Sequence, residues 1–416
     1  INILWNPLPQ KSCFFIPSHV IFSHICFFLI IFVPNIFVVM SSYYTPLSQP
    51  RYELLDGLRG VAALLVLGYH LFEAVAFAQG APEQNMYHGF LAVDFFFVLS
   101  GFVMGYAYDR QWDRMSIGTF IRRRLTRLHP MVVGGVFLGL VCFIIQGCTR
   151  WDGSQVSLSV LLWSTLLALF LLPSPGALDV RGNTEAFPLN GPHWSLFFEY
   201  IASLFYALFL HRFKDKWLFV WVFLAGIALF LNGFLSSQGD IAYGWSSEPY
   251  NLFGGLLRVS FSYPLGLLLS RRYKKTSEKG SFPFLLAALL LIAALSLPSF
   301  SHSDLSPMAL RISRIGYQML LLCVLFPFLL WIASQGSAKG RYTGPCIRFL
   351  GRLSYPLYAV HYPFIYLYIH WIETNQHPFG EAPWCSPVAV AVMSILAGTL
   401  FLLCWDEPIR RKLNRR

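Results

Sequence analysis

The chain is 416 residues long, and 56% of its residues are hydrophobic while only 12% are charged. Soluble domains carry about 25% charged residues, so this composition, with its repeated long apolar runs, argues against a soluble protein. It predicts an all-α, polytopic transmembrane helical bundle. The net charge of +11 lies in a few short basic clusters, which in a membrane protein mainly orient the chain. We therefore expect contact with membrane lipids and no nucleic-acid partner.

The first 39 residues are rich in Phe, Ile and Pro, contain no acidic residue and precede the first methionine, Met40. Segment 20–39 has the length of a membrane span or a signal-like segment. The alternative is upstream sequence translated in frame, with synthesis starting at Met40, and we favour this interpretation. The predicted organisation is a non-native or upstream hydrophobic leader over 1–39, followed by one integral membrane domain over 40–416.

The first apolar run after Met40 contains four ionisable residues, Asp56, Arg59, His70 and Glu73. Such groups inside a span usually face a bundle interior or a water-filled cavity and mark function. Arg59 and His70 are eleven positions apart, close to three helical turns, and each acid lies one turn beyond. One helix face should therefore carry acid, guanidinium, imidazole and acid over roughly 25 Å.

The imidazole of His70 is the predicted centre of this face. A histidine can take and give a proton near neutral pH, or attack an activated acyl group itself. The alternative is a hydrogen bond to a neighbouring helix, which membrane histidines also make. In the second span Asp94 lies among three phenylalanines. We expect Asp94 to orient or charge-balance His70 or Arg59, with a structural ion pair as the alternative.

Four arginines, Arg122, Arg123, Arg124 and Arg127, precede His129-Pro130 at the start of the third span. An orientation signal explains part of this cluster. Arginine is also the preferred bidentate phosphate binder, so the four are candidates for holding a phosphorylated carrier such as coenzyme A. Anionic lipid head groups are the competing ligand.

Two later segments carry polar groups into predicted spans. The segment GPHWSLFFEY places His193, Trp194 and Ser195 at the start of a span, with Glu199 inside it, where a carboxylate is costly. The segment GRLSYPLYAVHYPFIYLYIH is rich in tyrosine and contains Tyr358 and His361. These side chains suit a polar cavity, and an interhelical hydrogen-bond network is the alternative. The eight cysteines form no CxxC pair, and we expect no metal site.

Hydropathy predicts about ten full crossings and one short or re-entrant helix at 158–172. Basic residues gather in every second loop and at the C-terminus, which the positive-inside rule places in the cytoplasm. This pattern is consistent only if 158–172 does not cross fully, and it places both ends of 40–416 in the cytoplasm. The predicted spans lie near 54–78, 88–108, 126–148, 194–211, 217–235, 252–270, 282–298, 315–334, 350–371 and 387–405.

Together these segments resemble the acyltransferase 3 family of integral membrane acyltransferases. The resemblance runs from about Tyr52 to Arg410. No single segment is specific, but the ordered set is, with ten residues between Arg59 and His70. The segments in family order are LLDGLRGVAALLVLGYH, VDFFFVLSGF, FIRRRLTRLHP, HWSLFFE, LSYPLYAVHYP and DEPIRRKL.

The family transfers an acyl group, often acetyl, from a cytoplasmic donor, typically acyl-coenzyme A, to a hydroxyl that often belongs to a cell-surface carbohydrate. On that pattern His70 matches the essential histidine and Arg59 its basic partner. Arg124 and Arg127 match the RxxR pair, and Glu199 matches the carboxylate of the WSLxxE-like segment.

Two features depart from common family patterns. His129-Pro130 stands where an Arg-Pro-like pair is usual, and the sequence contains no SGNH hydrolase-like domain of the kind that many relatives carry. The resemblance therefore implies the stand-alone form of these enzymes.

The predicted function is that of a bacterial inner-membrane O-acyltransferase with its C-terminus in the cytoplasm. Acyl-CoA would be the donor substrate and no cofactor would stay bound; the acceptor would be a carbohydrate or lipid-linked glycan. A proton-coupled transporter or flippase of a lipid-linked glycan is the first alternative, and a lipid-binding scaffold the second. The predicted catalytic residues are His70, Arg59, Asp94 and Glu199; the donor-binding residues are Arg122, Arg123, Arg124 and Arg127; the acceptor or cavity residues are Glu73, His193, Trp194, Ser195, Tyr358 and His361.

Overall fold

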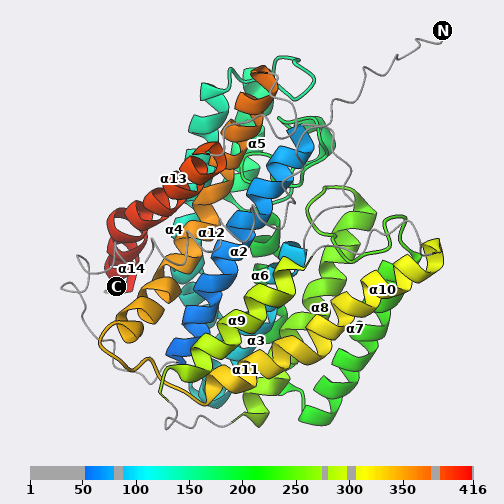
Figure 1. Cartoon of the computed structure of the whole chain (residues 1–416). Coiled ribbons are helices and arrows are strands. Elements are labelled where there is room, and N and C mark those ends of the chain that lie inside the picture. Colours follow the sequence, from blue (N-terminus) through cyan, green and yellow to red (C-terminus); the bar gives the residue numbers. More distant parts are fainter. Residues whose placement is uncertain (1–51, 79–87, 274–279, 298–305, 376–384, 415–416) are drawn as a thin grey trace.

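The computed structural model describes residues 52–78, 88–273, 280–297, 306–375 and 385–414, so the predicted leader 1–39 lies outside the described residues. Within these ranges the chain is a bundle of helices, which confirms the predicted all-α class (Figure 1). The α-helices are α2 (Glu53–Ala78), α3 (Ala92–Tyr108), α4 (Ile117–Ile145), α5 (Leu158–Leu169), α6 (His193–Leu208), α7 (Asp215–Leu235), α8 (Pro249–Arg272), α9 (Phe282–Ser296), α10 (Pro307–Leu320), α11 (Phe326–Ser334), α12 (Thr343–Thr374), α13 (Cys385–Phe401) and α14 (Glu407–Asn414).

Short irregular turns extend several of these helices. The 3₁₀ turn η3 (His88–Leu91) leads into α3, and η4 (Asp109–Arg114) follows it. Two π-helical turns, η7 (Leu321–Leu325) and η8 (Leu402–Asp406), join α10 to α11 and α13 to α14. Turns of this kind interrupt the regular backbone register and are frequent at functional sites.

The helices α2 and α12 lie side by side through the middle of the bundle (Figure 1). Both begin at the same end, where Arg348 pairs with Glu53 at 3.6 Å and Arg271 pairs with Asp109 at 2.6 Å. We call this the basic end. The opposite end, which we call the loop end, contains segments 146–157 and 172–192.

Among the described residues, seven helical segments are long and apolar enough, by length and composition, to cross a membrane: Glu53–Phe77, His88–Arg114, Ile117–Ile145, Asp215–Leu235, Pro249–Arg272, Pro307–Ser334 and Cys385–Asn414. Each coincides with a predicted span. The three other predicted spans coincide with α6 and α9, which have 16 and 15 residues, and with α12, which has 32 residues but is rich in Tyr, Pro and His. Crossing by these three helices stays a prediction.

The predicted short helix is confirmed as α5, whose 12 residues rise about 18 Å, less than the hydrocarbon thickness. Its end lies at the level of the middle of α4, because the Leu169 carbonyl contacts His129. The chain then turns at Leu171, which has a φ of 54°. Helix α6 begins at His193, beside Gly135 of α4, and so starts within the bundle.

Glycines allow a very close contact between α3 and α8. A Cβ atom on Gly101 would lie 1.9 Å from the carbonyl oxygen of Tyr263, and one on Gly266 would lie 1.9 Å from that of Val98. Only glycine permits this separation, in the way that small residues allow membrane helices to approach. The contact brings the polar side chains of α3 and α8 together in the bundle core.

Prolines inside the helices free carbonyl groups that other side chains then bind. Pro264 cannot donate to the carbonyl of Ser260, which instead accepts from the Trp221 indole at 3.0 Å. Pro363 likewise frees the carbonyl of Ala359, which accepts from Asn190 Nδ2 at 2.7 Å. The second bond ties the segment before α6 to α12.

The outward surface is apolar where a bilayer would contact it. Helix α7 shows this most clearly, since Phe219, Phe223 and Leu224 are 59%, 58% and 58% exposed. In water such a surface would be unfavourable, and in lipid it is not. The chain is therefore an integral membrane protein.

Candidate active site

The polar face predicted for α2 is present and is completed by α12. Arg59 donates from Nε to Ser354 Oγ at 2.8 Å and from Nη2 to the Gly351 carbonyl at 3.1 Å. The same guanidinium lies 3.3 Å from Asp56, one turn earlier. Arg59 is thus fixed between two helices near the basic end.

His70 and Glu73 form a close pair on the next part of this face. Nδ1 of His70 lies 2.7 Å from Oε2 of Glu73, and the side chains are 18% and 30% exposed. We call them the imidazole–carboxylate pair. Nε2 of His70 has no hydrogen-bond partner among the described residues and is not sealed from the surroundings. That nitrogen is available to a reacting group.

Aromatic rings from α12 hold the imidazole of His70 on two sides. His361 stacks on it at a centroid distance of 5.4 Å and an interplanar angle of 28°. Tyr362 lies edge-on at 4.7 Å and 82°. Two aromatic walls and the Glu73 carboxylate leave the His70 ring little freedom, and fixed orientation is what general base catalysis requires.

The four predicted donor-binding arginines do not form one cluster. Arg124 is 4% exposed and Arg127 is half-buried, whereas Arg122 and Arg123 are exposed. Helical geometry explains this, because positions three apart share a face while their immediate neighbours point elsewhere. The expectation of a single four-arginine cluster is therefore corrected to two separate pairs.

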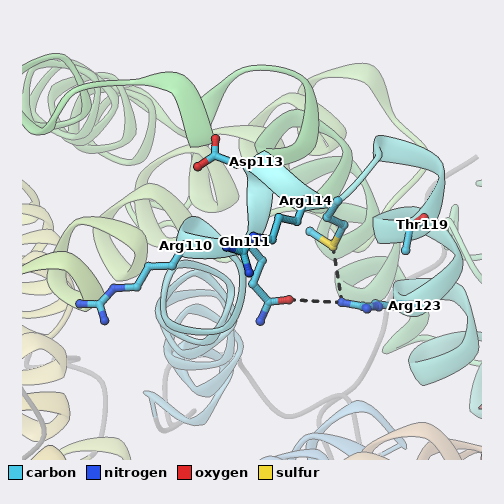
Figure 2. Close-up of a pocket in the computed structure, with 7 residues that line it drawn as sticks. Arg110, Gln111, Asp113, Arg114, Thr119 and Arg123 are labelled. Atoms are coloured by element: carbon cyan, nitrogen blue, oxygen red, sulfur yellow. Dashed lines mark hydrogen bonds between the residues drawn. The ribbon is translucent and has the colours of Figure 1, made fainter.

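Arg123 of the exposed pair lines a hollow at the basic end, which the corner between η4 and α4 forms. Nη1 of Arg123 lies 3.4 Å from Oε1 of Gln111 and 3.5 Å from the sulfur of Met115. Figure 2 shows Arg123 directed toward Gln111, whereas Arg110 and Asp113 extend away. The hollow is lined by Arg110, Gln111, Asp113, Arg114, Met115, Thr119 and Arg123. Its cations do not converge on one point.

Glu199 has a partner that the sequence did not identify. Nη2 of Arg124 lies 2.5 Å from Oε1 of Glu199, and Ser100 donates to the same oxygen at 2.8 Å. The pair joins α4, α6 and α3. A carboxylate inside the bundle is thereby compensated, in agreement with the cost of leaving it unpaired.

Three guanidiniums, from α2, α4 and α14, lie within electrostatic range of Arg127, and with it they form what we call the arginine cluster: Arg59, Arg124, Arg127 and Arg410. Three of them are paired with carboxylates, those of Asp56, Glu199 and Asp406, at 3.3, 2.5 and 2.9 Å. Arg127 forms no ion pair with any described residue. The cluster therefore carries one excess positive charge, located at Arg127.

Asp94 does not contact His70 or Arg59, contrary to expectation. It is fully buried and accepts two hydrogen bonds from Arg258 of α8, from Nε at 3.1 Å and from Nη2 at 2.6 Å. Arg258 also lies 5.0 Å from the ring of Trp194. Asp94 therefore forms a structural ion pair, which was the alternative role expected for it. Arg258 could have been identified from the sequence as the only charge within its apolar run.

The remaining predicted cavity residues line the inner end of α6. The hydroxyls of Ser195 and Tyr358 lie 2.7 Å apart, which links α6 to α12. Trp194 is 9% exposed and packs in the core instead of at an interface. His193 is fully buried and neither ring nitrogen has a partner among the described residues; Nε2 of His361 is also unpartnered. Buried polar atoms without a partner are uncommon, and they mark candidate functional positions.

A polar group at the loop end was missed in the sequence. Tyr366 of α12 donates to Oε2 of Glu185, and the guanidinium of Arg181 lies 3.6 Å from the Tyr366 ring centroid. Burial raises the pKa of Glu185 to about 8, although the Tyr366 bond and Arg181 oppose this. Glu185 lies in an irregular segment with no periodic pattern, so local sequence gave no signal.

Comparison with known proteins adds independent information. Residues 52–403 match the family described as an acyltransferase domain. Acyltransferase MdmB of Streptomyces mycarofaciens is 26% identical over 396 residues, which cover 88% of this chain and 93% of that protein. No solved structure matches the chain at a significant level.

Two further relatives match different lengths of the chain. Peptidoglycan O-acetyltransferase OatA of Listeria monocytogenes is 25% identical over 396 residues, 88% of this chain and 57% of that protein. Protein 2 in the picA locus of Rhizobium radiobacter is 35% identical over 165 residues, 38% of this chain and 81% of that protein. The chain thus spans little more than half the length of the Listeria protein.

Proposed function

The chain belongs to the acyltransferase family that matches residues 52–403, and from this premise we propose that it transfers an acyl group from acyl-CoA to a hydroxyl of a carbohydrate or lipid-linked glycan. The observation that carries the proposal is the 2.7 Å contact between His70 and Glu73, which leaves one imidazole nitrogen available within the bundle. An oriented imidazole beside a carboxylate is the arrangement that activates a hydroxyl for acyl transfer.

In the proposed reaction Nε2 of His70 accepts the proton of the acceptor hydroxyl while that oxygen attacks the thioester carbonyl carbon. The carbon–sulfur bond then breaks, and the imidazolium returns the proton to the leaving thiolate. The products are an ester and free coenzyme A thiol. Glu73 stabilises the transient imidazolium, because an opposite charge at hydrogen-bond distance favours the protonated ring.

The donor phosphates would bind at the arginine cluster. Arg127 is the unpaired cation of this cluster, and guanidinium groups bind phosphate well. Arg59 and His70 are separated by about 16 Å along α2, a separation that suits a donor with a long arm between its phosphates and its thioester. We further propose that the basic end faces the cytoplasm of a bacterium, in its inner membrane, in accordance with the positive-inside rule.

The acceptor would approach from the loop end, because Glu73 lies in the part of α2 farther from the basic end and its side chain is 30% exposed. The printed name of the Listeria relative includes peptidoglycan, and a surface carbohydrate is the acceptor class we propose for this chain. Mass spectrometry of surface glycans from a deletion strain, compared with the parent strain, would identify the acceptor by a lost acyl mass.

The enzyme activity itself is tested with purified protein in lipid. Acetyl-CoA is supplied, and release of free thiol is followed with and without a glycan fraction from the deletion strain. We expect glycan-dependent thiol release and acyl incorporation into the glycan. Glycan movement across the membrane with no acyl consumption would instead support a transporter.

A further inference from the structure

Glu185 is a buried carboxylate with an unusual set of neighbours. It is 8% exposed, and its hydrogen-bond donor is the hydroxyl of Tyr366, which is 1% exposed. No Lys or Arg of the described ranges lies within ion-pair distance of it. A carboxylate that has a neutral hydrogen-bond donor in place of a counterion is costly to keep charged. This cost points to a role for Glu185 beyond packing.

The segment that carries Glu185 is held by the neighbouring loop. Glu185 pairs with Ser246 in an antiparallel bridge, Ala186 N donates to the Trp245 carbonyl at 2.9 Å, and Ser247 N donates to the Thr184 carbonyl at 2.9 Å. The carboxylate is therefore placed by backbone bonds on both sides. It is not a mobile surface group.

A continuous set of rings leads from this carboxylate to His70. The rings of Tyr366 and Tyr362 lie edge-to-face at 4.7 Å and 87°, and Tyr362 meets His70 at 4.7 Å and 82°. We call Tyr362 and Tyr366 the tyrosine column. Buried rings in such contact move together, because close packing leaves no space for one to shift alone.

The titratable groups that face Glu185 come from three elements of the chain. Arg181 and Asp179 lie on its own segment, Tyr366 is on α12, and Glu73 of α2 is close enough to act electrostatically. The interaction with Glu73 connects the segment directly to the imidazole–carboxylate pair. The ring contacts and the electrostatic interaction with Glu73 thus both connect Glu185 with the imidazole–carboxylate pair.

We propose that Glu185 is a positioning residue for acyl transfer, which acts through Tyr366 and Tyr362 on the imidazole–carboxylate pair. The inference rests on the proposed function of that pair. Ionised Glu185 accepts a charge-assisted bond from Tyr366, about twice as strong as a bond to the neutral acid. The charged form fixes the tyrosine column against His70, and the neutral form holds it less firmly.

This role predicts a dependence of turnover on pH. Burial raises the pKa of Glu185 to about 8, so the carboxylate is mainly neutral below that pH and mainly charged above it. kcat should therefore increase as the pH rises through about 8. The increase should be roughly threefold to tenfold, as expected from exchanging a neutral for a charged hydrogen bond.

The test compares the full-length protein with Glu185→Gln in lipid, using acetyl-CoA and thiol release between about pH 6 and 9.5, with the background rate without protein subtracted. Glutamine keeps the acceptor oxygen but cannot titrate. We expect kcat of this variant to stay at the low-pH wild-type level, with an unchanged KM for acetyl-CoA. Tyr366→Phe should give the same flat profile, and the double variant should be no slower than either, because both act in one pathway.

Asp240→Asn is the matched control. Asp240 is a half-buried carboxylate between α7 and α8, with a pKa that desolvation raises, and it accepts the Ala242 N–H at 3.0 Å. This variant should keep the rise near pH 8. Infrared difference spectra should show a protonated carboxyl band that disappears near pH 8 in the wild type and is missing from Glu185→Gln.

The outcomes separate this inference from the proposed function. A rise near pH 8 that persists in both Glu185→Gln and Tyr366→Phe, or an infrared band with no transition there, would overturn the role of Glu185. Wild-type turnover in His70→Ala would overturn the proposed function itself. An inactive His70→Ala together with an unchanged profile in Glu185→Gln rejects the positioning role alone.

Discussion

Two acid–base pairs lie inside this bundle and differ in how completely they are enclosed. Asp94 and Arg258 are 0% and 1% exposed, and two hydrogen bonds join them. His70 and Glu73 are joined by one contact, and both side chains are partly exposed. The first pair has every charge compensated by protein atoms. The second leaves one imidazole nitrogen without a partner among the described residues.

The difference separates a charge that serves folding from one that serves chemistry. A buried pair that is fully hydrogen-bonded has no capacity left for a substrate, and breaking it leaves an uncompensated charge. A pair with a free nitrogen can bind and exchange a proton with a small change in structure. Removal of a partner should therefore affect stability in the first pair and turnover in the second.

The largest expected effect is the loss of turnover in His70→Ala. Removing the imidazole deletes the proton acceptor, and general base catalysis contributes roughly 10²–10⁴-fold. Thermal unfolding in detergent should change little, because the ring makes few hydrogen bonds. Thiol release from acetyl-CoA and the unfolding midpoint are measured on the same preparation. Retained turnover would show that His70 is not the base.

Asp94→Asn should have the opposite phenotype, with loss of folded protein. The change leaves Arg258 charged and buried without its counterion, at a cost of about 3–5 kcal/mol. Size-exclusion chromatography and thermal unfolding measure the loss. The matched control replaces both partners with apolar residues, Asp94→Leu with Arg258→Met, and should recover much of the stability. A stable but inactive Asp94→Asn would instead give Asp94 a catalytic role.

Glu73→Gln should reduce turnover by less than the loss of the imidazole. Glutamine leaves the transient imidazolium without a neighbouring negative charge, so we expect turnover to fall by about tenfold to a hundredfold. kcat should fall while KM for the donor stays unchanged, since Glu73 stabilises the imidazolium that forms during the reaction and does not contact the bound donor. Tyr69→Phe, which removes a 3.4 Å contact to the other carboxylate oxygen, is the control and should change kcat little.

Features that lie within a single helix could be predicted from the sequence. The face of α2 follows from helical periodicity, and its two internal pairs, Arg59 with Asp56 and His70 with Glu73, are both one turn apart. The α-helical class, the family and the short helix α5 follow from hydropathy and ordered motifs. These features need only local information.

Partners on different helices could not be predicted from one sequence. Asp94 and Arg258 are 164 positions apart, and Glu185 and Tyr366 are 181 apart. Which helices meet depends on side-chain packing across the whole bundle, such as the glycine contact of α3 with α8, and not on a local pattern. A helical projection of the third span places Arg124 on a different face from Arg122 and Arg123. The division of the four arginines into two pairs could therefore have been predicted from the sequence.

The smallest expected effect concerns the arginine cluster. Arg127→Gln removes the unpaired cation, and we expect the KM for acetyl-CoA to rise roughly tenfold, the value of one charged hydrogen bond. Its kcat at saturating donor should stay near wild type, because a contact made equally in the ground and transition states changes KM alone. Arg122→Gln is the matched control, since it removes an exposed arginine from the same helix and should leave KM within about twofold. An equal rise of KM in both variants would indicate that the overall positive charge of the basic end attracts the donor, and that Arg127 is not a specific binding site. A collapse of kcat at constant KM in Arg127→Gln would mean that this guanidinium acts on the transition state, and the site of the donor phosphates would then have to lie elsewhere.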